Sequence, residues 1–236
     1  MKISQKFLLA VNALTVSAIL LLNYFYQSSG FDFTLKCICS ALFALLGVIN
    51  LIYALVIKAD NVHFYIGMSA GLILAFLGDY LIGYDFIFGA AAFALGHICF
   101  VIAYCFLHKM RYADLLISMI FFVPGTVFLL FSPLLTFDLP IFRIVCIIYA
   151  LIISLMLGKA VGNFLLERSL NSMLIALASA LFLFSDLMLV FDWFIGLWSW
   201  TDNACMGTYY PALCILAFSM IIQIIKKSEI LKSEQR

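Results

Sequence analysis

Eight apolar segments dominate this sequence, and each is long enough to cross a membrane as a helix. A helix needs about 20 mostly apolar residues to span the hydrocarbon core of a bilayer. The connections between the segments are short and leave no room for a soluble domain. The sequence therefore predicts an all-α polytopic membrane protein, a single transmembrane domain with eight helices in one bundle. These helices are expected over residues 7–26, 37–57, 62–82, 87–107, 113–132, 141–158, 171–190 and 205–225, followed by a cytoplasmic tail over 226–236.

The composition agrees with a membrane protein and excludes other classes. Hydrophobic residues make up 67% of the chain and charged residues 11%, whereas about a quarter of a soluble protein is charged. A net charge of +1 gives no basic surface for nucleic acid, so no nucleic-acid partner is expected. The seven cysteines contain no CxxC pair and lie mostly in apolar runs. Buried thiols are therefore favoured over disulfides or a zinc site.

The distribution of basic residues predicts the orientation of the bundle. An even number of spans places both termini on one side, and every Lys and Arg except Lys36 and Arg143 falls on that side. Because basic residues concentrate on the cytoplasmic side of membrane proteins, both termini are expected in the cytoplasm. The short loops favour a bacterial cytoplasmic (inner) membrane.

Two acidic residues, Asp79 and Asp186, lie inside predicted helices, and the other acidic residues are assigned to loops or tails. A carboxylate in a membrane costs at least about 2.5–3.5 kcal/mol at the helix centre, so it usually faces the bundle interior and marks a functional site. Each residue precedes the outer end of its helix by three or four positions, about 5–6 Å below the same boundary. A solvated carboxyl near the interface is the alternative for either residue alone. Their matched depth favours a shared site.

A weak internal repeat relates the two aspartates. Gly78-Asp79 aligns with Ser185-Asp186, and Asp85-Phe86 aligns with Asp192-Trp193, at an offset of 107 residues. This offset is close to four helices, which would give two parallel four-helix halves related by an axis along the membrane normal. Chance also explains so short a match. If the repeat is real, the two aspartates face each other across the axis.

Residues in the third and fourth predicted helices are candidates to support the aspartates. A stripe of small residues, including Gly67 and Gly71, leads to Asp79 at spacings of four and allows a neighbouring helix to approach closely. Gly89, Phe93 and His97 share one face of the next helix, with His97 near the middle of the membrane. His97 is either part of the site or a structural hydrogen-bonding residue between helices.

Charged and aromatic residues near the outer boundary have two interpretations each. Lys36 and Arg143 either snorkel to lipid phosphate, which is favoured, or act as fixed cations beside an aspartate or a substrate phosphate. The run Tyr209-Tyr210-Pro211 is expected to anchor its helix at the interface, and Tyr149 could do the same. An aromatic belt or a lid is expected from Trp193, Trp198 and Trp200.

The chemistry available near the aspartates is that of an acid and a base. His63 and His108 fall at the opposite, cytoplasmic helix ends, so a histidine-rich zinc site is not expected. The sequence contains neither a Gly-x-Ser-x-Gly elbow nor a His-Glu-x-x-His motif. Two carboxyl groups in a low-dielectric place favour keeping one proton between them. No metal or cofactor is predicted.

Four stretches of the sequence resemble the YhhN-type lysoplasmalogenases. They are Gly78-Asp79-Tyr80-Leu81, Phe88-Gly89-x-x-x-Phe93-x-x-x-His97, Tyr149-Ala150-Leu151 through Met156, and Ala180-Leu181-Phe182-x-x-Ser185-Asp186. They span most of the third to seventh predicted helices, and their combination is specific although each piece is short. The family's lysine-proline pair at the start of the second helix appears here as Lys36-Cys37. The family's arginine before the last motif has no clear counterpart.

The resemblance implies eight helices and hydrolysis of the vinyl ether bond of a lysoplasmalogen to a fatty aldehyde and a glycerophosphoethanolamine or glycerophosphocholine. Such a bond is hydrolysed by proton transfer to its β-carbon, which forms an oxocarbenium ion that water traps. One aspartate would protonate the substrate, and the other would stabilise the cation and activate water. The expected partners are a lysophospholipid substrate and membrane lipids. The candidate catalytic residues are Asp79 and Asp186, with His97, Lys36, Tyr149, Ser185, Gly78, Phe93 and Gly89 as substrate-binding or supporting residues.

Two other functions fit the same residues. A small proton- or cation-coupled transporter could use the aspartates as a relay, since intramembrane carboxylates are common in such proteins. A non-catalytic membrane scaffold is the third interpretation, and it leaves the cost of two buried acids unexplained. Incubation with an alkenyl lysophospholipid and its ester analogue separates an enzyme from a transporter.

Overall fold

The computed structural model describes residues 3–30, 32–196 and 200–234, with side chains as far as residue 226. These residues form eight α-helices and no strand, and every helix is long and apolar enough to span a membrane. The predicted all-α membrane fold is therefore confirmed. Trp198, part of the predicted belt or lid, lies outside the described residues. The helices are α1 (Ile3–Ser28), α2 (Phe33–Val56), α3 (Val62–Leu81), α4 (Phe86–Leu107), α5 (Tyr112–Phe131), α6 (Pro140–Glu167), α7 (Leu170–Phe194) and α8 (Thr201–Glu234).

Side chains in the loops fix several helix starts. The Asp32 carboxylate accepts a hydrogen bond from the backbone N–H of Leu35, which starts α2 four residues before its predicted first residue. Asp85 caps α4 through the N–H groups of Ile87 and Phe88. Carboxylates at these positions satisfy backbone donors that have no partner inside the helix. The earlier start of α2 places Lys36 in its first turn.

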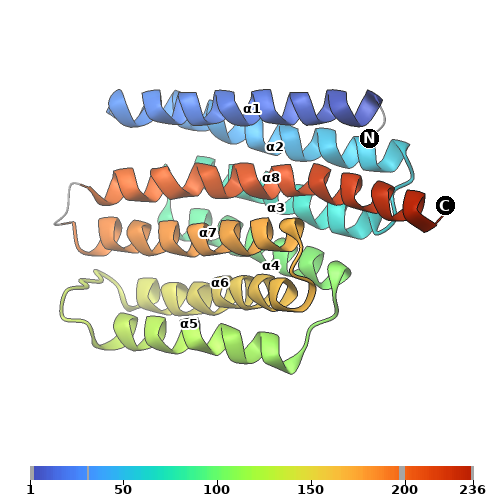
Figure 1. The fold of residues 1–236 in the computed structure, drawn as a ribbon. Coiled ribbons are helices and arrows are strands. Elements are labelled where there is room, and N and C mark those ends of the chain that lie inside the picture. Colours follow the sequence, from blue (N-terminus) through green and yellow to red (C-terminus); the bar gives the residue numbers. More distant parts are fainter. Residues whose placement is uncertain (1–2, 31, 197–199, 235–236) are drawn as a thin grey trace.

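The neighbours of each helix agree in part with two four-helix halves (Figure 1). Contacts join α1 to α2, α2 to α3 and α3 to α4, and the same order recurs from α5 to α8. Between the halves, the contact of α2 with α8 has its equivalent in the contact of α6 with α4. The contacts of α1 and α3 with α8 have no such equivalent, so any twofold relation is approximate. Helix α8 thus packs against several helices, whereas the backbone of α5 lies close only to that of α6.

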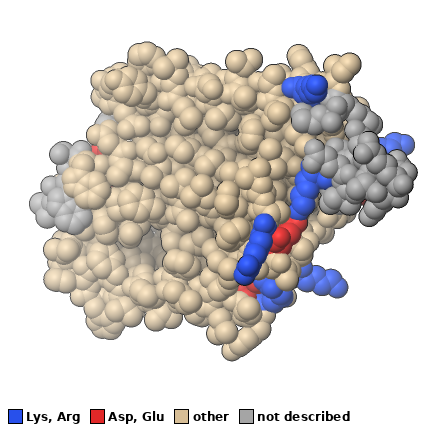
Figure 2. All heavy atoms as spheres, in the orientation of Figure 1, with Lys and Arg blue, Asp and Glu red and all other residues tan. Residues whose placement is uncertain are grey.

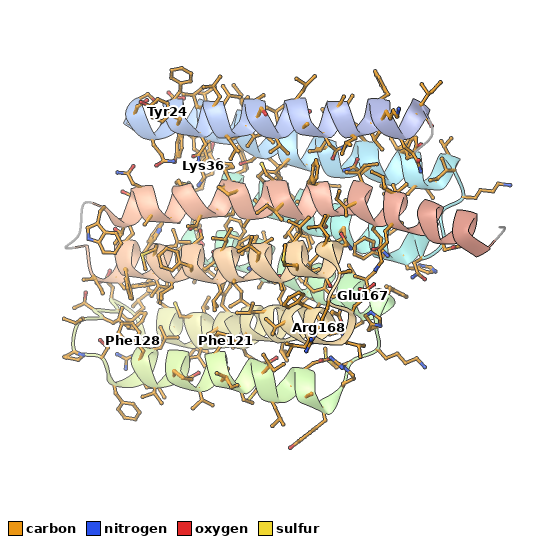
Figure 3. The ribbon with its side chains drawn as sticks, viewed as in Figure 1. Tyr24, Lys36, Phe121, Phe128, Glu167 and Arg168 are labelled. Carbon is orange, nitrogen blue, oxygen red and sulfur yellow. The ribbon has the colours of Figure 1, made fainter. Side chains whose placement is uncertain are left out.

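Charged side chains are concentrated at the end of the bundle where both termini lie (Figures 1 and 2). Glu167 and Arg168 lie at that end, and Lys36 lies toward the opposite end (Figure 3). The rest of the displayed face carries hardly any charge. This separation agrees with the predicted sorting of basic residues between the two sides of the membrane.

Several predicted boundaries differ from the structure, and the two largest differences arise because helices continue beyond their apolar segments. Helix α6 was expected to end at residue 158, but it continues to Glu167, and the predicted tail over 226–236 is helical as far as Glu234. Lys159 is therefore inside α6, where it is fully buried with its Nζ 2.9 Å from an Asp114 oxygen. Asp114 was grouped with the loop acids although it is the second residue of the predicted helix 113–132; it lies in the first turn of α5 and is buried. Each buried charge is tolerated because the other lies beside it.

The close crossing of α5 and α6 depends on two glycines spaced four residues apart. A Cβ at Gly158 would meet Ser118 Oγ, and a Cβ at Gly162 would meet the Asp114 carboxylate. Small residues at this spacing let helix backbones approach closely in a membrane. The sequence Gly158-Lys159-x-x-Gly162 thus brings Asp114 within reach of Lys159.

The small-residue stripe predicted on α3 packs against α4. A Cβ at Gly71 would lie 2.5 Å from the Phe100 ring, and a Cβ at Gly67 would lie 2.9 Å from Ala103 Cβ. This close packing fixes the position of α4 against α3. It therefore sets the distance between Asp79 on α3 and His97 on α4.

Candidate functional site

Asp79 is buried and is surrounded by donors from α2 and α8. Its Oδ2 accepts hydrogen bonds from Ser40 Oγ at 2.5 Å and from the Tyr209 hydroxyl at 2.6 Å. The Lys36 ammonium lies 3.5 Å from Oδ1, and only 2% of the Asp79 side chain is exposed. Hydrogen bonds and a cation favour the ionised form of a carboxyl group. The arrangement is suited to holding Asp79 as an anion.

Asp186 has a different set of partners, which come from α4 and α6. The Tyr149 hydroxyl donates to Asp186 Oδ2 at 2.7 Å, and His97 Nε2 lies 2.7 Å from the Tyr149 oxygen and 3.3 Å from the same Asp186 oxygen. His97 is 1% exposed, and its Nδ1 has no hydrogen-bond partner among the described residues. The Tyr149 hydroxyl already donates its own proton to the Asp186 carboxyl group. A proton on His97 Nε2 can therefore be donated to the Tyr149 oxygen and to Asp186 Oδ2. The partners of Asp186 are thus a tyrosine and a histidine, and no ion pair joins it to a lysine or arginine within the part of the chain that the structure describes.

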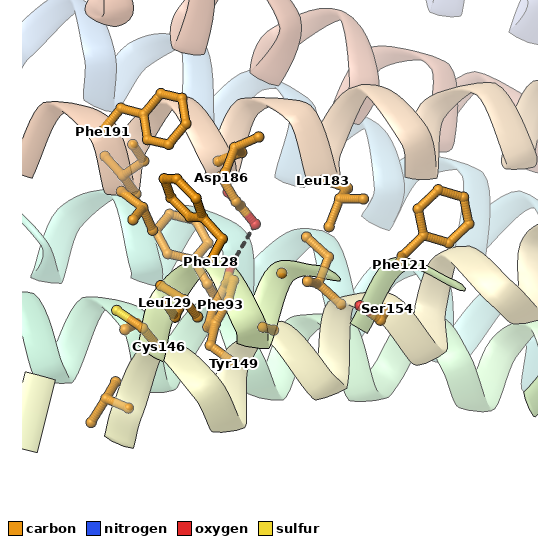
Figure 4. A pocket seen from close by; sticks show the side chains of 18 of the residues that line it. Phe93, Phe121, Phe128, Leu129, Cys146, Tyr149, Ser154, Leu183, Asp186 and Phe191 are labelled. Atoms are coloured by element: carbon orange, nitrogen blue, oxygen red, sulfur yellow. Dashed lines mark hydrogen bonds between the residues drawn. The ribbon is translucent and has the colours of Figure 1, made fainter. Parts of the chain in front are cut away.

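A large apolar chamber lies against Asp186. It has a volume of about 330 Å³ and is lined by residues of α4, α5, α6 and α7 and by Ile82, which directly follows α3. Figure 4 shows the Asp186 carboxyl in the wall of this chamber, with its hydrogen bond to Tyr149 and the rings of Phe121, Phe128 and Phe191 around it. Asp186 is the only charged residue among its lining. The chamber therefore suits a hydrocarbon chain with one ionisable group beside it.

A second, much smaller cavity lies between the two aspartates. Its volume is about 20 Å³, and Lys36, Asp79, Asp186 and Tyr209 contribute to its lining. A cavity of this size with charged side chains in its wall has room for about one water molecule. Ile82, Phe93, Asp186 and Leu189 line both spaces, so the same residues lie between the apolar chamber and the small cavity.

The aspartates share this small cavity but do not contact each other directly. No hydrogen bond joins them among the described residues, and the backbones of α3 and α7 are not neighbours there. The two carboxyl groups therefore do not share a proton through a direct hydrogen bond, as the sequence suggested, but belong to two separate hydrogen-bond networks. The two networks have the same plan. Asp79 on α3 has partners from α2 and α8, and Asp186 on α7 has partners from α6 and α4. In each half, the aspartate of the third helix thus meets the second helix of its own half and the fourth helix of the other half.

A protein-family model, the YhhN family, matches residues 31–220 of the chain. The chain belongs to the YhhN family. The matched range contains both aspartates and every partner described above, so the two networks lie inside the family's shared region. No curated protein and no solved structure matches the chain significantly.

The remaining predicted site residues shape the YhhN site by packing. A Cβ at Gly78 would lie 2.7 Å from the Phe93 ring, so glycine lets Phe93 lie across α3 beside Asp79. Gly89 similarly allows α4 to approach Ile82. Ser185 is buried next to Asp186 and makes a 3.4 Å contact with Cys205 Sγ. These residues set the shape of the small cavity.

Two residues that donate hydrogen bonds to Asp79, Tyr209 and Ser40, were not predicted as site residues. Tyr209 was expected to anchor α8 at the interface, which is wrong, because it is 3% exposed and donates to Asp79. Its neighbour Tyr210 is also buried and bonds to the Lys36 carbonyl oxygen. Ser40 lies four residues after Lys36 on the same helical face, a spacing that would have identified it. A tyrosine in an apolar helix gives the same sequence pattern whether its side chain faces lipid headgroups or a buried acid.

The two basic exceptions have different positions in the structure. Lys36 is beside Asp79, which favours the fixed-cation interpretation over snorkelling to lipid. Arg143 instead lies with its guanidinium carbon 5.0 Å from the centre of the Phe137 ring and lines neither cavity. At the end of the chamber that points away from both termini, the Trp193 ring packs 5.0 Å from Phe86, which lines the chamber.

Proposed function

We propose that this YhhN protein is a lysoplasmalogenase that hydrolyses the vinyl ether bond of lysoplasmalogens to a fatty aldehyde and a glycerophosphoethanolamine or glycerophosphocholine. Family membership supports a hydrolase of this kind. The observation that carries the proposal is the position of Asp186 between an apolar chamber and a small cavity whose lining includes Asp79 and Lys36. A vinyl ether at this junction has its chain in an apolar space and a carboxyl group at its double bond.

The two networks suit different roles in the reaction. Asp186, which makes no ion pair with a lysine or arginine among the described residues, is proposed to donate a proton to the β-carbon of the vinyl ether, which leaves an oxocarbenium ion. Asp79, held as an anion by Lys36, Ser40 and Tyr209, stabilises that cation and accepts a proton from the attacking water. The resulting hemiacetal collapses to the aldehyde and the glycerol hydroxyl. His97 and Tyr149 position the Asp186 carboxyl.

The proposed orientation places both termini in the cytoplasm, and the proposed location is a bacterial inner membrane. Asp79 and Asp186 then lie in the outer half of the bilayer. The vinyl ether bond of a lipid in that leaflet lies just below its headgroup, at about the depth of the two carboxyl groups.

A paired-substrate assay tests the proposal. Purified protein is incubated with an alkenyl lysophospholipid and with its ester analogue, and aldehyde and free fatty acid are both measured. Aldehyde from the first without fatty acid from the second is the expected result. Release of fatty acid, or ion-gradient-dependent uptake with no aldehyde, contradicts the proposed reaction.

Replacing Tyr209 by Phe is expected to lower the aldehyde-forming rate by about 10-fold or more, because a hydrogen bond to a charged group contributes about 1.5–3 kcal/mol. Tyr209 donates directly to the Asp79 carboxylate. Tyr210→Phe is the matched control, since its hydroxyl contacts Ser40 and the Lys36 carbonyl but not the carboxylate. Equal rates in the two variants would remove Tyr209 from the site.

A further inference from the structure

The apolar chamber is bounded on one side by a gap between α5 and α7. The backbone of α5 lies close only to α6, and α5 occupies the edge of the bundle (Figure 1). Across the gap, the rings of Phe128 and Phe191 lie 5.6 Å apart, centre to centre. Both rings line the outer part of the chamber, so the gap lies on the deeper side of this aromatic pair (Figure 4).

Residues at the edges of the gap are partly exposed on the surface that faces the membrane. Phe121 on α5 is 37% exposed and Leu187 on α7 is 41% exposed, yet both line the chamber. Gly125 lies one turn after Phe121 on the α5 edge, and a Cβ added there would meet no atom within 4 Å. Pro124 precedes it inside the helix and also lines the chamber. The chamber is thus open to the hydrocarbon region of the bilayer beside Gly125.

The dimensions of the chamber require such an opening for a long chain. Its lining on α7 runs from Leu183 to Phe191, about 12 Å along the helix. Asp186 lies three residues from the deeper end of this stretch, and on α6 the lining ends at Ser154, five residues beyond Tyr149, so about 4–8 Å of chamber extends below Asp186. One leaflet of the hydrocarbon core is about 15 Å thick. A chain whose reacting bond lies at Asp186 therefore leaves the chamber sideways.

We propose that the gap between α5 and α7, beside Gly125, is a lateral portal through which a single-chain ether lipid enters from the outer half of the bilayer. The first carbons of its hydrocarbon chain occupy the chamber, and the remainder passes through the portal into the surrounding lipid. The identity of the ligand rests on the proposed function. The portal itself rests on the gap, the open space at Gly125 and the position of Asp186.

Photolabelling tests the portal independently of catalysis. The probe is an alkyl lysophospholipid with a diazirine halfway along its chain, which has no vinyl ether to hydrolyse. It is incorporated with the protein into lipid nanodiscs, irradiated, and located by mass spectrometry of the labelled peptides. Labels are expected on the segments 121–128 and 183–191. Labels confined to other segments overturn the portal.

Gly125→Trp should fill the opening and lower this labelling by about tenfold or more, because an indole occupies the space that the chain needs. Gly207→Trp is the matched control, since an added Cβ at Gly207 also meets no atom within 4 Å but Gly207 lines neither cavity. If Gly125→Trp does not fold, Leu187→Trp tests the opposite edge, with the similarly exposed Leu177→Trp as its control. Labelling of a folded portal variant at the wild-type level contradicts the proposal.

Aldehyde release measured on the same samples separates the two proposals. Labelling of the portal segments without aldehyde from a lysoplasmalogen supports the portal and contradicts the proposed reaction. Aldehyde release that Gly125→Trp and Leu187→Trp leave unchanged, with labels elsewhere, overturns the portal while the reaction stands.

Discussion

Replacing Asp186 by Asn is expected to lower aldehyde release from a lysoplasmalogen by about 10²- to 10⁴-fold, the usual contribution of a general acid or base. The amide has nearly the same shape as the carboxyl group, and it can still accept the hydrogen bond from Tyr149. It cannot deliver an acidic proton to the β-carbon of the substrate. The measurement is the initial rate of aldehyde formation by purified protein.

Asp192→Asn is the matched control for this variant. Asp192 lies six residues farther along α7 and lines neither the chamber nor the small cavity. Its replacement makes the same chemical change on the same helix, so its rate should stay near that of the wild type. Both variants are checked for a monodisperse elution profile and an unchanged thermal midpoint. Near-normal turnover by folded Asp186→Asn protein removes this residue from the catalytic role.

Replacing Lys159 by Met is expected to lower the free energy of unfolding, which is the second large effect. The Lys159 ammonium is fully buried, 2.9 Å from both an Asp114 oxygen and the Lys109 carbonyl oxygen. Removing it leaves the Asp114 carboxylate buried with Arg111 as its remaining cation. Breaking a buried ion pair from one side costs about 3–5 kcal/mol, so the free energy of unfolding in detergent should fall by a large part of that amount.

Lys109→Met is the matched control for Lys159→Met, because the Lys109 side chain is exposed and the substitution leaves its carbonyl oxygen in place. It should change stability little. In the double variant Asp114→Asn/Lys159→Met, the uncompensated charge is gone, so its loss should be smaller than the sum of the two single losses. Additive losses would show that the two charges do not stabilise each other.

The sequence alone determined the fold class and the residues to examine. A run of about 20 apolar residues satisfies its own backbone as a helix in lipid, which leaves few other structures available to this chain. The same cost of burying charge identified Asp79 and Asp186, because an acid inside an apolar segment stands out in the sequence. The intramembrane position of His97 made it a further candidate, and the family resemblance added Tyr149 and Ser185; all three lie at Asp186.

Tertiary structure decided which groups surround each acid and where the space lies. Lys36 and Ser40 reach Asp79 from α2, and Tyr209 reaches it from α8. The tyrosine gives no signal in the sequence that distinguishes a buried partner from an interface anchor. Lys159 was assigned to a loop because its charge ends an apolar run, and only the packing of α5 on α6 shows that Asp114 compensates it. The chamber beside Asp186 exists because α5 meets α6 alone and leaves a gap toward α7. Hydropathy reports the cost of placing each residue in lipid, whereas side-chain partners and empty space depend on how the helices pack together.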